Sequence, residues 1–565
     1  MKFYFTFLTI IFFTCNLSIK LKAQDKTFWQ NIALDGQVGL HYDWYRMTAL
    51  EGQVQARRPS ELLRFMAMGS VGYKSISIPY ALNISSRQTN LVTPIPTEGN
   101  FLNYLVNPYN AIGLSPETKY GKIYLGSNIP QHSSYTTGAL RTFGFGADLK
   151  HKEWVGGVYG GITQVAVESD TTNNIQGSYR RRVYAYKFGY GKKEGKHLYI
   201  SYLKSFDEEN SVKNQLSIAP EENVVLVLDG RWDFGKDLYV EAEYAKSVYT
   251  ANSAGESTGR IEGQFLSRLI SINSSSRLGD ALKGSIGLNK NNYKLKLTTE
   301  YLTPGFVTLG FPFMQSDRLD ITLNPQVSLL NKKLNIGGSV GRRANNVSGL
   351  KGNTTYQALL NVNANWQLSD RWAVNANFSN FGFRNTVRND TLRVENVSRT
   401  ISISPSYTFA SAKHNHVITF TTSIDDYIDY NIVYGNESDN NSYTALLMYL
   451  LSWKDKPLTA DFTVSRFNND NQAGKMSVNS VSGGINYQYF KKKMQSGIKL
   501  VYLQNQLPDN ETAGQTLLSI QHRHRIIKNL SFNFQGSINL FKQNRADEGL
   551  HYRETLLQTQ LIYSF

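Results

Sequence analysis

A short serine motif is the first stretch of the sequence whose residue types and spacing could carry chemistry. GGSVG at 337–341 has the G-x-S-x-G pattern of a nucleophilic serine, which needs a sharp strand-to-helix turn to expose its hydroxyl. Ser339 instead lies inside an alternating run that predicts a strand, so chance explains the match. The sequence has no phosphate-binding loop, H-E-x-x-H motif or calcium-binding loop. We therefore predict that the protein is not an enzyme and assign no catalytic residue.

Two histidine pairs are the candidates for a metal site. His414 and His416, like His522 and His524, are two residues apart on predicted strands, which places both rings of a pair on one face. A catalytic zinc needs a third protein ligand, and no sequence neighbour supplies one. The only cysteine, Cys15, lies in the predicted leader. We expect no metal and no cofactor. Both pairs flank short turns, so we interpret them as rim residues of the periplasmic side.

Asparagine recurs at every second position between Leu360 and Phe378. The apolar residues of this stretch alternate with the asparagines on either side of a tight turn at Ser369 and Asp370. This pattern predicts a hairpin with one apolar and one polar face. If the wet face lines a channel, its amides would suit sugars or other neutral polar solutes. The lining residues would be Asn361, Asn363, Asn365, Asn375 and Asn377.

The same alternation continues along the whole chain. From Ile32 onward we count about 24 alternating segments, within a range of 22 to 26. Very short turns, such as 331–333, 454–456 and 491–493, alternate with longer polar links. The longer links include 207–221, 250–279, 303–317, 384–396, 425–440 and 542–550. Tight periplasmic turns and long outside loops are typical of membrane barrels, so we predict an all-β fold, a single large antiparallel transmembrane β-barrel.

Length, composition and charge agree with one continuous membrane architecture. The chain has 565 residues without a dividing linker, 12% of them are aromatic, and Tyr is the commonest aromatic at 34 copies. The net charge of +16 is not gathered on one stripe, so we expect no nucleic-acid partner. Lys2, a short apolar run and Ala23 predict a signal peptide over 1–23, which leaves 24–565 as the barrel.

The carboxy terminus adds a family resemblance. TLLQTQLIYSF places Leu561, Tyr563 and Phe565 on one face and ends on an aromatic residue, which resembles the assembly signal of Gram-negative outer-membrane β-barrels. The resemblance implies a location in the outer membrane, recognition by the barrel assembly machinery, and contact with outer-membrane lipid and lipopolysaccharide. The leader ending in Ala-Gln and residues 107–138 are similar to uncharacterised outer-membrane barrels of Bacteroidetes, which supply no activity to carry over.

One link breaks the predicted alternation. Residues 85–117 form a long link where a short periplasmic turn is expected, and four prolines keep it out of a regular sheet. Its most apolar part makes it too oily for a solvated loop, so we expect either an inward-folded plug or a periplasmic flap. The apolar residues are Leu102, Tyr104, Leu105 and Val106.

An apolar strand could face this segment. In TALLMYLLSW, residues 444–453, the alternation points Leu446, Met448 and Leu450 inward if Trp453 faces lipid. Apolar lumen residues need cover, which residues 85–117, an apolar ligand or a partner subunit could supply; a dry patch of barrel wall is the alternative. These three residues and the apolar part of 85–117 are the candidate constriction.

Two functions remain after these considerations. About 24 strands enclose a lumen wider than that of a porin with 16 to 18 strands, so some closure is required. The first strand begins near Ile32, so we expect no separate amino-terminal plug domain. We favour a channel or transporter-like porin for polar solutes with an internal constriction. The alternative is a non-conducting barrel that is a scaffold or subunit of an assembly, secretion or surface complex.

Overall fold

The computed structural model describes most of the chain after the predicted leader. The described residues are 32–87, 110–138, 140–171, 175–213, 218–258, 265–389, 391–431, 433, 438–472, 474–508, 511–544 and 549–565. The predicted signal peptide, 1–23, lies outside them. None of the helices in the described ranges is long and apolar enough to cross a membrane.

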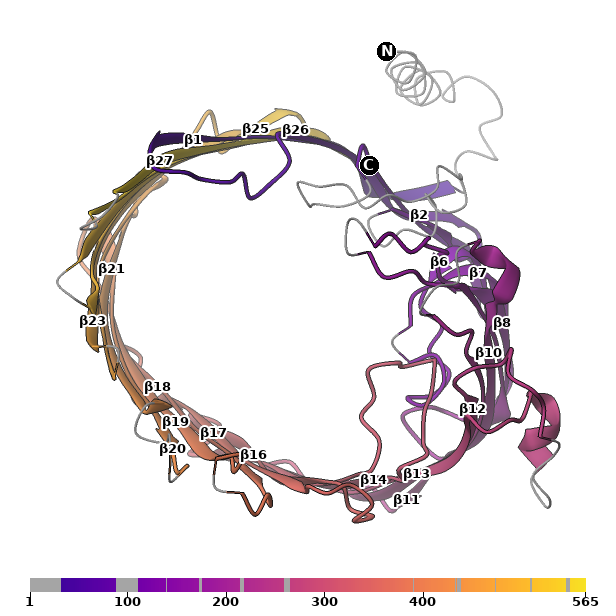
Figure 1. The fold of residues 1–565 in the computed structure, drawn as a ribbon. Helices are drawn as coiled ribbons and strands as arrows, with labels where there is room; N and C mark the ends of the chain where they lie inside the picture. The colour runs from indigo at the N-terminus through magenta and orange to yellow at the C-terminus, as the bar shows by residue number, and fades with distance from the viewer. Residues whose placement is uncertain are drawn as a thin grey trace, which may run out of the picture.

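The described strands form one antiparallel sheet that closes into a barrel (Figure 1). The first strand, β1 (Ile32–Glu51), pairs with β2 (Glu61–Tyr73) on one side and with the last, β27 (Leu550–Ser564), on the other. Two short strands, β4 (Ala111–Leu114) and β5 (Glu117–Thr118), share one place in the sheet. The 27 described strands therefore make a barrel of 26 strand positions, which confirms the predicted all-β barrel at the upper end of its range.

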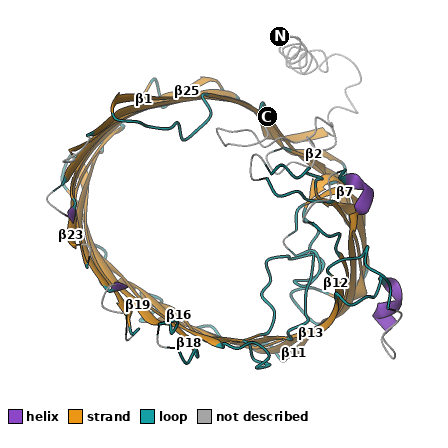
Figure 2. Ribbon diagram, in the orientation of Figure 1, coloured by secondary structure: helices purple, strands orange, loops and turns teal. Residues whose placement is uncertain are grey.

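The other strands follow the order of the sequence around the barrel, each paired antiparallel with its neighbours. They are β3 (Ile76–Ser85), β6 (Gly121–Asn128), β7 (Thr142–His151), β8 (Trp154–Gln164), β9 (Arg180–Gly191), β10 (His197–Glu208), β11 (Glu222–Phe234), β12 (Leu238–Thr250), β13 (Ser276–Asn289), β14 (Tyr293–Leu302), β15 (Arg318–Leu329), β16 (Leu334–Asn345), β17 (Thr355–Gln367), β18 (Trp372–Asn385), β19 (Glu395–Ala410), β20 (His414–Asp429), β21 (Asn440–Trp453), β22 (Leu458–Asn471), β23 (Gly474–Tyr489), β24 (Met494–Gln506), β25 (Thr512–Ile527) and β26 (Leu530–Asn544). Two short 3-10 helices, η1 (Glu209–Ser211) and η2 (Phe265–Leu269), lie in the links (Figure 2).

The strands keep a period of two because each has a different environment on its two faces. On β9, Tyr184, Tyr186 and Phe188 are exposed on the outside of the barrel, whereas Val183 and Ala185 are fully buried on the inside. Side chains alternate across a strand, so one register suits both environments at once. The exterior is therefore apolar and aromatic along its length.

Turns and links differ at the two ends of the barrel. At one end, which we call the short-turn end, strands are joined by tight turns such as Lys152–Glu153, 330–333 and 490–493. At the other, the long-link end, the predicted links 250–279, 303–317 and 384–396 lie between strand ends, as expected. The predicted alternation of link lengths holds around most of the barrel. It fails between β22 and β23, which two residues, 472–473, join at the long-link end.

The expected break in this alternation at 85–117 is wrong. A hairpin turn at Lys74 and Ser75, where Lys74 has a φ of 53°, joins β2 to β3. This turn lacks the Gly, Asn or Asp that would have marked it in the sequence. Because of it, Ser85 and Ala111 both lie at the long-link end, where a long link is normal. Residues 88–109, with Leu102, Tyr104, Leu105 and Val106, lie outside the described residues.

Candidate functional site

The inner wall of the barrel is the candidate site, and its two halves differ in charge. A row of charged residues runs across β11 to β16, each residue directly paired with the next in the sheet. The row consists of Asp229, Glu243, Lys283, Glu300, Asp320 and Arg343. Four of these six residues are acidic, and among the described residues Arg343 holds only Asp320, at 2.7 and 2.8 Å, so the other acidic groups take partners from outside the row.

The wall that continues from β16 is polar and carries fewer charges. Ser339 on β16 pairs with Asn361, and Asn363 pairs with Asn377, which pairs with Ser402 on β19. The register places all five predicted asparagines, Asn361, Asn363, Asn365, Asn375 and Asn377, on the same inner face as Arg343. The neighbouring strands continue this lining with serine and threonine hydroxyls, such as Ser423. Amides and hydroxyls both donate and accept hydrogen bonds, so this wall can replace the hydration of neutral polar solutes.

The apolar residues predicted to face inward do so. Met448 pairs with Thr419, and Leu446 with Thr421, and these threonines continue the serine row of β19 on the inner face. Leu450 lies on the same face, and all three side chains are half-buried. In Figure 1 the wall at β21 lies across the barrel from the inward links around β8, β10 and β12.

Two long links fold into the lumen and pack together against the charged wall (Figure 1). They are the β6–β7 link, described over 129–138 and 140–141, and the β14–β15 link, 303–317. Tyr135 and Phe306 are fully buried and meet edge to face, with ring centroids 5.5 Å apart. They cover the inward residues Val183, Leu203 and Val225, among others. We call residues 129–141 and 303–317 the inward links.

Carboxylates of the charged wall hold the first inward link. The Tyr135 hydroxyl donates to Glu300 Oε1 at 2.7 Å, and the hydroxyls of Ser133 and Ser134 donate to the two oxygens of Glu243 at 2.5 and 2.7 Å. Burial and the Glu300 charge both raise the pKa of Tyr135, so the phenol stays protonated and remains a donor. The acidic row therefore has partners in the link that covers it.

The second inward link is tied to the wall and to the first. Asn223 on β11 donates from its amide to Val307 O at 3.1 Å and accepts from Leu309 N at 3.0 Å. The Thr308 hydroxyl donates to Tyr135 O at 2.8 Å. At Gly310 a Cβ would lie 1.5 Å from Thr136 O, so only glycine allows the two backbones to approach this closely.

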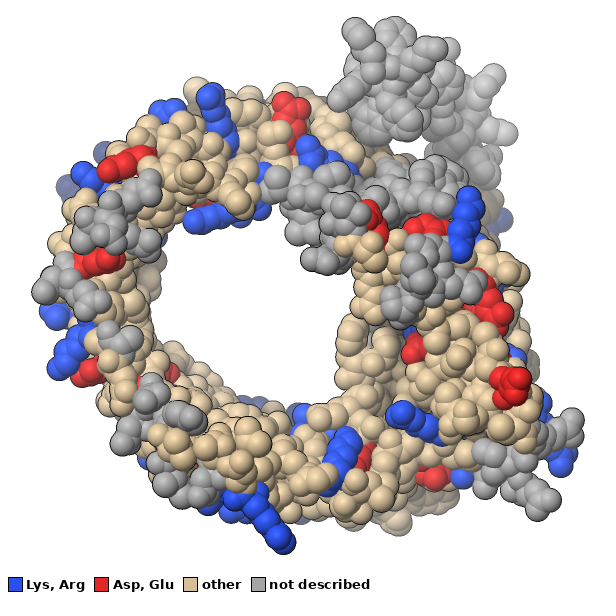
Figure 3. Space-filling view, in the orientation of Figure 1, with Lys and Arg blue, Asp and Glu red and all other residues tan. Residues whose placement is uncertain are grey.

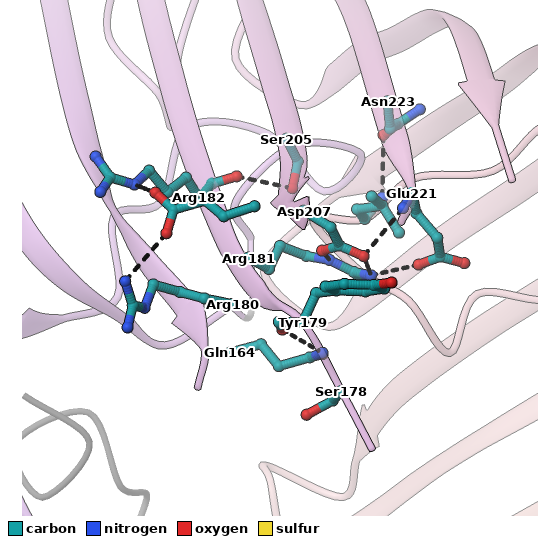
Figure 4. A network of polar contacts seen from close by, with 12 residues as sticks. Gln164, Ser178, Tyr179, Arg180, Arg181, Arg182, Ser205, Asp207, Glu221 and Asn223 are labelled. Carbon is teal, nitrogen blue, oxygen red and sulfur yellow. Dashed lines mark hydrogen bonds and ion pairs between the residues drawn. The ribbon is translucent and has the colours of Figure 1, made fainter. Parts of the chain in front are cut away.

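A network of charged side chains holds together the strands next to the inward links at the long-link end (Figure 4). Arg181 binds both oxygens of Asp207 at 2.7 and 2.9 Å and also contacts Glu221, which accepts from Tyr249 at 2.5 Å. Arg181 and Asp207 are both buried, and a bidentate pair of this kind fixes geometry as well as charge. The network therefore fixes the positions of β9 and β10 beneath the links.

The described residues leave the lumen open beside the inward links. In the space-filling view the described wall leaves a wide opening through the barrel, and the inward links narrow it from one side only (Figure 3). The opening is bordered mainly by the weakly charged wall of β16 to β27 (Figures 1 and 3).

The histidine pairs face outward, not into the lumen. His416 hydrogen-bonds the Tyr449 hydroxyl at 2.8 Å, and His414 packs edge to face on Trp453 in the outer aromatic belt. His522 lies 2.8 Å from Ser496 Oγ. Within the described ranges, no three His, Cys, Asp or Glu side chains gather as a metal site would require.

The sequence predicted one inward link as a loop and did not single out the other. The range 303–317 was expected as a long link, but nothing in the alternation of lengths says which long links turn inward. Buried aromatics inside a polar link, here Tyr135 and Phe306, are the signal that could have shown it.

Comparisons with known proteins find structures of similar architecture but with low sequence identity. No protein-family model matches the chain. No curated protein matches it. Among solved structures, the P pilus usher (PapC) translocation pore has a TM-score of 0.41 at 10% identity, covering 94% of this chain and 100% of that one.

Two further solved structures are similar at the same level. A ferric enterobactin receptor (PfeA) mutant from Pseudomonas aeruginosa has a TM-score of 0.42 at 10% identity, covering 94% of this chain and 81% of that one. OccAB2 of Acinetobacter baumannii has a TM-score of 0.29 at 10% identity and covers 61% of this chain and 92% of that one. With TM-scores below 0.5, these similarities support no conclusion about what this chain binds or transports.

Proposed function

We propose that the protein is an outer-membrane channel for polar solutes, narrowed on one side by the inward links. The observation that carries the proposal is a closed barrel with an apolar exterior, whose described residues leave a lumen open beside a polar, weakly charged wall. A packed core would not need polar residues at every second position facing inward. A water-filled passage does, because its wall must hydrogen-bond the water and solutes that fill it.

The exterior supports a membrane location. On β21 the outward residues from Tyr443 to Trp453 are all aromatic or aliphatic. At about 3.3 Å per residue and a tilt of roughly 40°, this stretch rises about 25 Å, the height of the apolar band of outer-membrane barrels. Near the long-link end of this band, Arg399 and Arg466 on the exterior are suited to the anionic headgroups of lipopolysaccharide.

Conductance of the purified protein in planar lipid bilayers tests the proposal. We expect single channels that pass small ions of both signs with little preference, since the open wall carries few charges. Vesicles holding the protein should also swell in solutions of neutral sugars. Silent bilayers together with non-swelling vesicles, from protein whose heat-modifiable band shows an assembled barrel, would contradict the channel.

One observation favours the second candidate, a scaffold or subunit of an outer-membrane complex. Leu446, Met448 and Leu450 form an apolar patch on the inner wall that the inward links do not reach. A partner subunit entering the lumen would bury this patch. Under this proposal, substituting Leu446 and Met448 by serine should release a protein that co-purifies with the barrel and should increase conductance.

A further inference from the structure

Two rows of amide side chains cross the inner wall near the short-turn end. In the first row Asn486, Gly497, Gln521, Gln535, Gln558 and Asp43 are directly paired from β23 to β1. The second row lies two residues closer to the short turns. Its directly paired residues, again from β23 to β1, are Gln488, Gln495, Arg523, Asn533, Gln560 and His41. We call these two rows the amide ladder. Six strands at about 4.8 Å spacing give it a length of about 24 Å, which suits a chain molecule more than a single ring.

The ladder borders a hollow in the wall. One part, of about 310 Å³, is lined by Gln495, Arg523, Asn533 and Gln560, among others. A second part, of about 120 Å³, is lined by Asn486 and Lys499. The two parts share Gln521 and Gln535, so they adjoin.

One glycine, Gly497, leaves room for the amides. A Cβ at Gly497 would lie 2.2 Å from Asn486 Oδ1 and 2.7 Å from Gln521 Nε2. These two amides are hydrogen-bonded to each other at 2.7 Å directly above that glycine. A larger residue at Gly497 would therefore break the first row.

One guanidinium of the ladder has no acidic partner among the described residues. Asp43 is paired with Arg64 at 3.0 Å, and Asp461 beside the first row is paired with Lys499 at 3.2 Å. Arg523 forms no ion pair with any described residue, and it lines the larger part of the hollow. Arg525, on the same strand face, is not among the residues that line it. Asn533, directly paired with Arg523 in the sheet, has a buried Oδ1 with no hydrogen-bond partner in the described part of the chain.

We propose that the amide ladder binds an acidic oligosaccharide, with Arg523 taking a carboxylate and the flanking amides taking hydroxyls. Each amide can donate to one sugar hydroxyl and accept from another, which a lining of purely charged groups cannot do. The guanidinium fork matches a carboxylate with two parallel hydrogen bonds. The site rests on the proposed channel function only for the entry of the sugar, and it adds a solute class to it.

Binding to the full-length protein in detergent micelles tests the proposal without any need for conductance. The probes are a β-1,4-linked glucuronate trimer and cellotriose, its neutral counterpart, measured by isothermal titration. We expect the glucuronate trimer to bind about tenfold more tightly, the size of one charge-assisted contact. Arg523→Gln should remove this difference, whereas Gln535→Ala should weaken both probes about fivefold.

Lys294→Gln is the matched control, because Lys294 is a lumen-facing cation near the short-turn end of β14, on the other wall. It should leave the binding of both probes within about twofold of the parent. Equal losses in the Arg523 and Lys294 variants would show a general lumen potential and overturn the site. Equal affinity for the two probes, or no binding of either at millimolar concentration, would also overturn it. Absent conductance with intact binding would contradict the channel alone.

Discussion

Single residues decide how closely the inward links pack. Tyr135 is the residue on which the first link turns inward, because its ring packs against Phe306 while its hydroxyl reaches Glu300. Asn223 performs the matching task for the second link by bonding backbone groups on both sides of Thr308. Buried polar groups are stable only when each has its partner, so these contacts form together or not at all.

Gly310→Ala should loosen the inward links and raise the conductance of single channels. The added Cβ would lie 1.5 Å from Thr136 O, so the two backbones must separate and the lumen widens. Gly352→Ala is the control, since a Cβ there meets nothing within 4 Å and conductance should not change. Equal single-channel conductance of the Gly310 variant and the parent would mean that the inward links do not limit the passage.

At the scale of elements, β27 is the strand that closes the barrel. It pairs with β26 and β1, and the backbone of Phe565 exchanges two hydrogen bonds with that of Gly36, at 3.0 and 3.3 Å. Leu561 and Tyr563 of β27 face away from the lumen, and the ring centroids of Tyr563 and Phe565 lie 6.1 Å apart. An unclosed strand edge in lipid would leave a row of backbone groups without partners.

Tyr563→Ala combined with Phe565→Ala should lower the amount of protein in the outer membrane several-fold. The two rings form the outward aromatic end of the closing strand, which we expect the assembly machinery to recognise. The heat-modifiable band in the outer-membrane fraction measures the effect, with Ser564→Ala as the control between them. Parental levels of folded barrel in the double variant would remove this role from the terminus.

At the scale of the whole molecule, link length and membrane orientation should go together. Peptide tags inserted at 384–396 or 542–550 should be accessible to antibody on intact cells, because both links lie at the long-link end. A tag at Ser369, in the short turn between β17 and β18, should become accessible only after the outer membrane is permeabilised. The reverse pattern of labelling would invert the topology and place the amide ladder at the outer mouth.

The sequence by itself determined the class of fold and the rule of its links. Alternation with a period of two survives in β17 and β18 despite their many asparagines, because each face of a barrel strand has its own solvent. The same alternation sufficed to predict that Leu446, Met448 and Leu450 face inward, since only the face had to be known. It failed at Lys74 and Ser75, where the turn residues carry no local signal.

Only the tertiary structure decided where the lumen is narrowed and where its wall could bind a solute. Thr308 and Tyr135 are 173 residues apart in the sequence, so their hydrogen bond depends on the register of every strand between them. The amide ladder likewise exists only because five successive pairings bring single residues of six strands side by side, including β1 and β27 from opposite ends of the chain. A period of two fixes the face of each side chain but not its height along the barrel, and height is set by pairing between strands.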